Sequence, residues 1–216
     1  VYETGERGEI LSSPEWLRWT QGNVVHSHMH NGETQDYANI RLDGWNAVGF
    51  DSSEWKQTEE VAPPDSDYFL QDCPPDRVIR YIKPALIAET ADSYVYDMGE
   101  NITGTPIIKS KERNICKIEL KASERIRTDK TLEEYTIHNQ CSQFITDGSD
   151  RLYSLRLTWY GFRYASVSKN AEIFFCAVIH ADVAVTSAFR CDNPTLTWLY
   201  DAYVRTQLDN YHCGVP

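Results

Sequence analysis

Two different hydrophobic periods occur along the chain, and they predict two kinds of secondary structure. From residue 78 to residue 185, short runs rich in valine, isoleucine, tyrosine and phenylalanine alternate with polar residues and are separated by turn residues. A period of two is typical of strands with one buried face. In the run 115–122, the even positions are apolar and three of the four odd positions are charged. The pattern predicts an all-β fold, with an antiparallel β-sandwich of the jelly-roll type over residues 77–186.

The period changes near the C-terminus. Asn193 can cap a helix, and Pro194 suits the first helical position. Apolar and aromatic residues then follow at spacings of three and four, namely Leu196, Leu199, Tyr200, Tyr203 and Val204. This spacing predicts one amphipathic helix from Asn193 to Tyr211. We therefore expect residues 187–216 to form a linker and a helix whose apolar stripe needs a partner outside the predicted β-sandwich.

Residues 1–76 have a weaker pattern. Short extended pieces are separated by turn signals, of which Asn31-Gly32 is the strongest and predicts a tight turn. The stretch 42–55 carries two glycines and two tryptophans, and 61–76 carries four prolines and is typical of a connecting segment. We expect residues 1–76 to form a partial accessory β-sandwich.

Charge and hydropathy narrow the classes of partner. The 216-residue chain has a formal net charge of -11, which disfavours nucleic acid as a partner, because phosphate binding needs clustered lysine and arginine. No apolar run is long enough for a membrane span. The chain starts at Val1 rather than methionine, so we expect a piece of a longer gene product. The compartment stays open between the cytoplasm and the periplasm or exterior.

Six cysteines are dispersed along the chain without a CxxC pair: Cys73, Cys116, Cys141, Cys176, Cys191 and Cys213. This spacing does not match a zinc ribbon or a dense disulfide framework. We interpret most of them as buried thiols, and their disulfide state stays open.

Three tracts, in this order, resemble the bacterial α-L-rhamnosidase family of glycoside hydrolases. The first is HSHMHNGETQDYANIRLDGWNAVGFDSSEWKQ, and the second is YVYDMGENITGTPIIK. The third combines LTWYGFRYASV with SAFRCDNPTLTWLYDAYVRTQLDNYHCGVP. The resemblance implies an accessory and linker region that precedes a catalytic (α/α)₆ barrel, which would lie beyond Pro216.

The resemblance also implies an activity and partners. The longer protein is expected to hydrolyse terminal α-L-rhamnosides with inversion and without an organic cofactor. We name no catalytic residue here and expect this piece to be inactive alone. Its expected partners are rhamnose-containing glycans and the catalytic domain of the same chain, with self-association through the exposed helix stripe. Two alternatives remain, a free-standing carbohydrate-binding module and an interaction or adhesion sandwich without a role in sugar binding.

Asn31, Glu33, Asp36 and Trp45 are the candidate sugar-binding residues. Accessory sandwiches of some family members bind rhamnose in part through calcium, and oxygen-rich loops supply the ligands that this ion prefers. Trp45 could stack on a sugar ring. The alternative interpretation is structural, with Asn31-Gly32 making a turn, Asp36 capping it, and Trp45 packing in a core.

A weak metal alternative comes from His26, His28 and His30, which would lie on one face of a strand. No cysteine or carboxylate has a spacing that would complete such a site, so we favour an exposed strand face and predict no metal. Near the middle of the chain, Gly99 is expected to make a turn or bulge, with a structural rather than a ligand-binding role.

Overall fold

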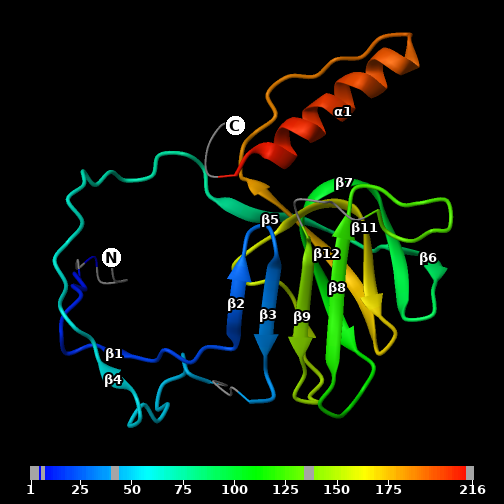
Figure 1. Cartoon of the computed structure of the whole chain (residues 1–216). Coiled ribbons are helices and arrows are strands. Elements are labelled where there is room, and N and C mark those ends of the chain that lie inside the picture. The colour runs from blue at the N-terminus through cyan, green and yellow to red at the C-terminus, as the bar shows by residue number, and fades with distance from the viewer. Residues whose placement is uncertain (1–4, 6–7, 40–43, 134–138, 213–216) are drawn as a thin grey trace. The chain divides into compact units, whose positions relative to one another are not determined.

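The structure of the protein is a computed structural model that describes residues 5, 8–39, 44–133 and 139–212 (Figure 1). The chain divides into two compact units. Unit 1 comprises Val1–Gly22 and Arg41–Leu70, and unit 2 comprises Asn23–Ile40 and Gln71–Pro216. Unit 2 therefore contains a segment of the N-terminal region that the sequence grouped with residues 1–76.

Unit 1 has little regular structure in its described residues. Strands β1 (Leu17–Arg18) and β4 (Lys56–Gln57) form a two-stranded antiparallel pair. Beside this pair the rings of Trp19 and Trp55 stack with their centroids 6.4 Å apart, and Phe50 lies 5.7 Å from Trp55. The aromatic residues thus form a small local cluster around one short ladder.

Unit 2 contains a ten-stranded sheet. Its main path runs in the order β2 (Val24–His28), β3 (Gly32–Asp36), β9 (Cys141–Ile145), β8 (Lys117–Ser123), β11 (Tyr160–Ser168), β7 (Ser93–Ser110), β12 (Ala171–Ala181) and β5 (Asp76–Ile82). Two further strands, β6 (Ala85–Glu89) and β10 (Leu152–Tyr153), also pair with β7. The predicted all-β fold is confirmed.

The sheet is mixed rather than purely antiparallel as predicted. Strand β3 pairs with β9 in parallel, with Thr34 opposite Gln143, whereas the other strand pairs described are antiparallel. Parallel neighbours need a long connection between them, and residues 37–140, the middle of the chain, separate β3 from β9. Local sequence patterns carry no information about the direction of such a distant pairing.

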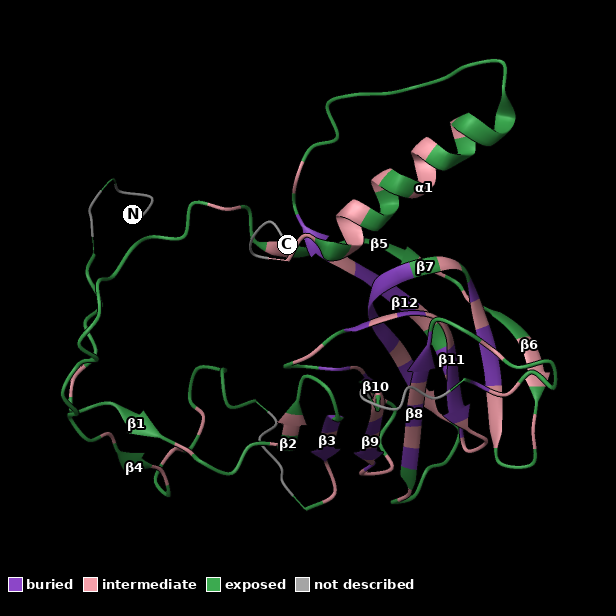
Figure 2. Ribbon diagram, turned by 45° about the horizontal axis from the view of Figure 1, so that its top comes forward, coloured by how far each residue is buried: buried purple, intermediate pink, exposed green. Residues whose placement is uncertain are grey.

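The sheet curls because β7 is long and changes partners along its length. Its first part pairs with β6 and β11, and its last part pairs with β12 and β10. Within the first part Gly99 has a φ of +84°, and the register with β11 shifts between Phe162 and Tyr164. A positive φ and a register shift both bend a strand. In Figure 2, β7 arches across the sheet, so that one ribbon supplies both sides of the core.

The core lies between the curled parts of this sheet. Ile108, Ile118, Leu120, Phe144 and Phe162 are each 0% exposed. The alternation predicted for residues 115–122 is confirmed, because Ile118 and Leu120 point into the core while the charged residues between them stay accessible. Figure 2 shows this burial concentrated in the central strands.

Helix α1 (Pro194–Asn210) follows the sheet, as predicted. The side chain of Asn193 accepts hydrogen bonds from the N–H groups of Thr195 and Leu196, and Pro194 occupies the first turn. The cap and the proline fix where the helix begins, as the sequence indicated. In the part of the chain that the structure describes, no helix has both the length and the apolarity to span a membrane.

The cysteines differ from the prediction in their burial. Of the five that are described, only Cys176 is buried, where removal from water raises the pKa of its thiol to about 12. Cys73, Cys116 and Cys141 are partly buried and Cys191 is exposed, so the description as mostly buried thiols was wrong. Cys213 lies outside the described residues.

Candidate functional site

The predicted turn at Asn31-Gly32 is present and joins β2 to β3. Asn31 is exposed, and its N–H donates to the carbonyl of His28 at 3.2 Å. Gly32 has a φ of +86°, and a Cβ at this position would lie 2.0 Å from the carbonyl oxygen of Cys141. Glycine is therefore required here by both conformation and space. The turn sets the register of β3 beside β9.

Glu33 is 1% exposed, and its carboxylate is fully engaged by the protein. Oε1 accepts a hydrogen bond from the N–H of Arg156 at 2.9 Å, and Oε2 accepts one from the N–H of Leu157 at 2.8 Å. The side-chain amide of Gln35 also donates to Oε1. These bonds attach the segment before β11 to strand β3. The geometry gives Glu33 a structural role and leaves no oxygen directed to solvent.

Asp36 is also engaged locally. Its carboxylate accepts hydrogen bonds from the N–H groups of Ala38 and Asn39 at 3.0 and 2.9 Å and from the Asn39 side chain at 2.7 Å. Burial alone would raise the pKa of Asp36, but these hydrogen bonds outweigh it and lower the pKa. The carboxylates of Glu33 and Asp36 thus both accept hydrogen bonds from N–H groups of the protein.

Trp45 is 55% exposed and belongs to unit 1, whereas Asn31, Glu33 and Asp36 belong to unit 2. The four predicted sugar-binding residues therefore do not share one compact unit. Within its own unit, Trp45 presents part of its ring to solvent.

The three histidines near β2 are exposed. The rings of His28 and His30 lie 5.6 Å apart and are tilted, and Nδ1 of His28 accepts a hydrogen bond from the N–H of His30. His26 lies on β2 opposite Thr34. Within residues 5, 8–39, 44–133 and 139–212, no group of three or more histidine, cysteine or acidic side chains is placed to hold a metal ion.

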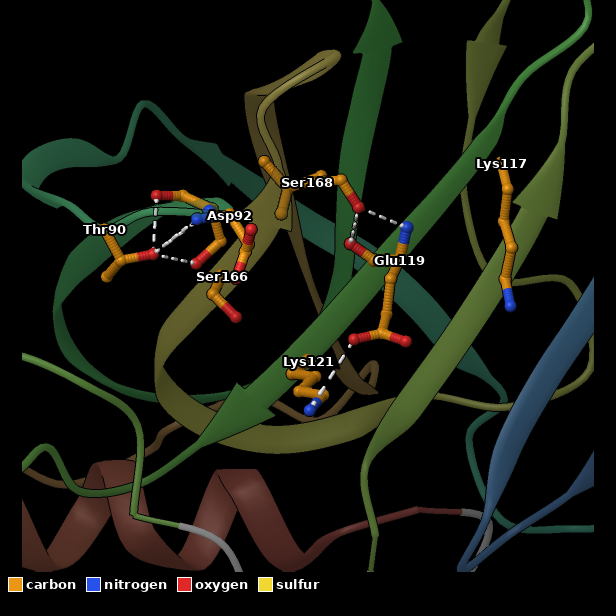
Figure 3. A pocket seen from close by; sticks show the side chains of 9 residues that line it. Thr90, Asp92, Lys117, Glu119, Lys121, Ser166 and Ser168 are labelled. Carbon is orange, nitrogen blue, oxygen red and sulfur yellow. Dashed lines mark hydrogen bonds and ion pairs between the residues drawn. The ribbon is translucent and has the colours of Figure 1, made fainter.

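A polar pocket lies elsewhere in unit 2, on the face of β8 that points away from the core (Figure 3). Its volume is about 470 Å³. The turn between β6 and β7, together with the first residue of β7, contributes Thr90, Asp92 and Ser93; β8 contributes Lys117, Glu119 and Lys121; and β11 contributes Ser166, Val167 and Ser168. We call these nine residues the polar pocket.

Strand register brings the three sources of the polar pocket together. Strand β11 lies between β7 and β8, with Ser168 opposite Ser93 and Ser166 opposite Lys121. Ser168 also bridges to β8, since its Oγ accepts a hydrogen bond from the N–H of Glu119 at 2.7 Å. Residues directly opposite on neighbouring strands share a face. The hydroxyl groups of β7 and β11 therefore lie beside the charged groups of β8.

The sequence alone does not indicate this pocket. The period of β8 indicated that Lys117, Glu119 and Lys121 share an outward face, but a charged outward face is typical of any sandwich strand. The serines of β7 and β11 lie beside this charged face only because β8 pairs with β11 and β11 pairs with β7. A local pattern carries no such signal.

The C-terminal end of α1 is fastened to the sheet of unit 2. Oδ1 of Asp209 accepts a hydrogen bond from the N–H of Thr103 at 3.3 Å. His212 follows the helix, with Nδ1 2.9 Å from Oδ2 of Asp76 and Nε2 3.2 Å from Oγ1 of Thr103. The ring of Trp159 stacks on that of His212 with centroids 3.9 Å apart. We call Asp76, Thr103, Trp159, Asp209 and His212 the helix anchor.

Asp209 is the perturbed carboxyl group of the helix anchor. Burial raises its pKa to about 6, although the hydrogen bond from Thr103 and the charges of His180 and Arg80 partly oppose this. Glu100, which pairs with Arg80 at 2.7 Å, adds a like charge that raises the pKa further. The Asp209 carboxyl group serves the attachment of the helix and is not part of the polar pocket.

The N-terminal half of α1 remains accessible. Leu196, Trp198, Leu199 and Tyr203 are between 47% and 62% exposed. No residue of α1, all of which is described, is buried. In Figure 1 the helix extends from its anchored end away from the strands of unit 2. The apolar stripe predicted from the sequence is therefore mostly uncovered.

Family models match two consecutive parts of the chain. A model of the α-L-rhamnosidase N-terminal domain matches residues 1–80, and a model of the bacterial α-L-rhamnosidase concanavalin-like domain matches residues 88–186. The second match covers the strands that line the polar pocket and form most of the core.

Relatives and solved structures agree with these matches. An α-L-rhamnosidase of Formosa agariphila is 25% identical over 76% of this chain and 18% of that protein, and one of Streptomyces avermitilis is 26% identical over 97% and 21%. The structure of the α-L-rhamnosidase from Dictyoglumus thermophilum superposes with a TM-score of 0.86 at 27% identity, covering 98% of this chain and 25% of that chain. The Streptomyces avermitilis enzyme complexed with L-rhamnose shares the fold, with a TM-score of 0.85 at 24% identity over 98% of this chain.

The chain thus spans about a fifth to a quarter of the length of these relatives, between 18% and 25%. Both family models occur in it in the order that the sequence motifs indicated. The chain belongs to the bacterial α-L-rhamnosidase family, as part of the β-rich N-terminal region of such a protein.

Proposed function

We propose that this chain is the non-catalytic N-terminal region of a longer enzyme that hydrolyses terminal α-L-rhamnosides, and that it supports the catalytic domain of that enzyme. The single observation that carries the proposal is the agreement over nearly the whole chain with an α-L-rhamnosidase structure that is about four times as long, since 98% of this chain covers 25% of that one. The remaining length of such an enzyme supplies room for a separate catalytic domain.

The carboxyl groups described here support a non-catalytic role. Glycoside hydrolysis uses two carboxyl groups that flank the scissile bond, one of them with a raised pKa. Asp209 is a carboxyl group with a raised pKa, but it accepts a hydrogen bond from the sheet and does not line the polar pocket. Glu33 is buried and bonded to the backbone of Arg156 and Leu157. Neither group is placed to protonate a leaving group.

Helix α1 is the part of the chain that we propose to contact the catalytic domain. Its C-terminal end is fixed by the helix anchor, so its direction is defined relative to unit 2. Its exposed side chains, Trp198, Leu199 and Tyr203, are of the kind that forms the centre of protein interfaces. An anchored helix with an uncovered apolar stripe suits a rigid connection between two domains.

A hydrolysis assay tests the proposed activity. The 216-residue chain and the complete gene product that contains it are each incubated with p-nitrophenyl α-L-rhamnopyranoside. We expect release of p-nitrophenol by the complete product only, and inversion at the anomeric carbon when the first-formed sugar is followed by NMR. Turnover by the 216-residue chain, or a gene whose reading frame ends at the codon for Pro216, would refute the proposal.

A pair of substitutions tests the supporting role. Leu199→Ser in the complete product places a hydroxyl in the proposed interface, and Leu70→Ser, at an exposed leucine of unit 1, is the matched control. We expect Leu199→Ser to lower the melting temperature and the activity of the complete product while leaving the melting of the 216-residue chain unchanged. Equal effects of the two substitutions would contradict the assignment of this interface.

A further inference from the structure

The polar pocket has the size and the construction of a small-molecule site. Its volume of about 470 Å³ lies within the range of roughly 300–1,000 Å³ that is usual for ligand pockets. Three separate segments of unit 2 form it, and Figure 3 shows side chains from all three directed around one space. Two of these segments are strands of the central sheet, so the floor of the pocket is rigid.

Several polar groups of the pocket are not used by the protein itself. Ser166 is 9% exposed, and its hydroxyl makes no hydrogen bond within the described part of the chain. The ammonium group of Lys117 and the carboxylate of Asp92 form no ion pair among the residues that the structure describes. Among the described residues the buried side-chain atoms without a partner are those of Asn23 and Asn170, so solvent reaches the Ser166 hydroxyl, which is free to hydrogen-bond to a ligand in the pocket.

Other groups of the pocket are held in place by internal bonds. The hydroxyls of Thr90 and Ser93 are 3.0 Å apart and hydrogen-bonded to each other. Lys121 pairs with Glu119 at 3.6 Å, and Ser168 is bonded to the backbone of Glu119. Groups that are fixed before binding lose little conformational entropy when a ligand arrives.

The charges of the pocket indicate a neutral ligand. Lys117 and Lys121 balance Asp92 and Glu119, so the lining carries no net formal charge. An anion would approach two carboxylates, and a cation would approach two ammonium groups. No arginine lines the pocket to bind a carboxylate or phosphate through two parallel hydrogen bonds.

The chemical class of the ligand follows from the hydrogen-bonding groups. Thr90, Ser93, Ser166 and Ser168 each carry a hydroxyl, which donates and accepts, while the carboxylates accept and the ammonium groups donate. A sugar presents several adjacent hydroxyl groups that also donate and accept, so it matches this alternation. We propose that the polar pocket binds a neutral saccharide unit, a function that goes beyond the proposed support of the catalytic domain and does not depend on it.

The pocket lacks an aromatic platform among its lining residues, and stacking on an aromatic ring would add strength to sugar binding. Binding is therefore weak, in the millimolar range. A neutral ligand held by hydrogen bonds also binds with little dependence on salt, because screening acts on charged partners.

The test is a titration of the 15N-labelled 216-residue chain with methyl α-L-rhamnopyranoside and, separately, with methyl β-D-galactopyranoside, D-glucuronate and inorganic phosphate. We expect saturable shifts of the amide signals of Asp92, Glu119 and Ser166 with a neutral sugar, unchanged by added sodium chloride. Saturable binding of phosphate or glucuronate in preference to both neutral sugars, or no saturable shift with any probe, would overturn the proposal.

Two substitutions locate the site. Ser166→Ala removes the unpartnered hydroxyl and Asp92→Ala removes the unpaired carboxylate, with Ser66→Ala and Asp72→Ala as controls at exposed loop positions. We expect each pocket variant to weaken sugar binding about tenfold, the effect of losing one good hydrogen bond, and the controls to bind like the parent. Unchanged binding by both pocket variants, with unchanged melting temperatures, would overturn the assignment. The assay uses no rhamnosidase activity, so its failure is distinct from that of the proposed hydrolysis.

Discussion

Unit 1 and unit 2 contain similar residue types but reach very different degrees of order. In its described residues unit 1 has one ladder of two-residue strands, and it leaves Phe69 88% and Leu70 97% exposed. Unit 2 has ten strands and a core in which Phe144 and Phe162 are 0% exposed. Both contain aromatic residues, so aromatic content alone does not produce a core. The difference lies in the sustained alternation of apolar and polar residues, which only unit 2 possesses.

The largest effect is expected at Gly104, where strand β7 lies close to the backbone of β12. A Cβ at Gly104 would lie 2.0 Å from the carbonyl oxygen of Ala177 on the neighbouring strand β12. We expect Gly104→Val to cost roughly 4 kcal/mol or more of unfolding free energy and to abolish the cooperative transition of unit 2. Circular dichroism melting measures this loss.

Gly99→Val is the matched control for that substitution. A Cβ at Gly99 would meet nothing within 4 Å, so only the positive φ of +84° opposes a side chain. We expect a smaller loss of about 1–2 kcal/mol, with saccharide binding retained. A melting temperature that barely moves would contradict a structural role for Gly99.

Strand β3 lies in the segment Asn23–Ile40, the part of the N-terminal region that belongs to unit 2. Glu33→Ala leaves the N–H groups of Arg156 and Leu157 without their acceptors inside the protein. We expect a loss of about 3 kcal/mol, because the substitution removes the acceptor of these two N–H groups and of the buried Gln35 amide and leaves a cavity where the Glu33 side chain was. Glu54→Ala, at an exposed glutamate of unit 1, should leave the melting curve unchanged. If both variants melt alike, β3 does not contribute to the stability of unit 2.

The pH dependence of the melting temperature tests the role of Asp209 in the helix anchor. The folded pKa of Asp209, about 6, lies above its ordinary value of 3.8. The folded state therefore holds this proton more tightly, and the stabilisation is full below the ordinary value and is lost as the pH rises through about 6. We expect Asp209→Asn to melt like the parent at pH about 4 and at a higher temperature than the parent at pH about 8. A difference that does not vary with pH would contradict this.

The smallest effect on unit 2 is expected from a substitution in unit 1. Trp55→Ala removes the stacking partner of Trp19 and should change the tryptophan fluorescence of unit 1. The unfolding free energy of unit 2 should change by less than about 0.5 kcal/mol, because Trp55 is not part of the core of unit 2. Trp159→Ala, which removes the ring stacked on His212, should by contrast lower the stability of the helix end in unit 2. A coupled loss of both transitions would mean that the units are not independent.

Short-range features of the fold could be predicted from the sequence, whereas long-range ones could not. The alternation around Ile118 and the cap at Asn193 depend on neighbouring residues, and both are found as expected. The parallel pairing of β3 with β9 depends on residues far apart in the chain, and no local pattern contains it.

The same distinction between short-range and long-range features applies to the candidate site. Glu33 follows a turn and was a candidate for ligand binding, yet its carboxylate meets backbone N–H groups near residue 156 that only the folded sheet brings close. The polar pocket depends on the register of three strands, which places Ser166 opposite Lys121 and Ser168 opposite Ser93. Residue type and spacing indicated which residues of β8 face outward, but not which residues of the neighbouring strands lie beside them.

The parallel strand β3 has a consequence for dividing the gene. Its hairpin is encoded between the two halves of unit 1, so no single cut in the sequence separates the two units intact. A fragment starting near residue 77 would lose β2 and β3 and leave β9 as an exposed edge strand. The unpaired backbone groups of such a strand can pair with strands of other molecules. Recombinant production of the second family domain alone should therefore yield aggregates, whereas a fragment that begins ahead of Asn23 should stay in solution.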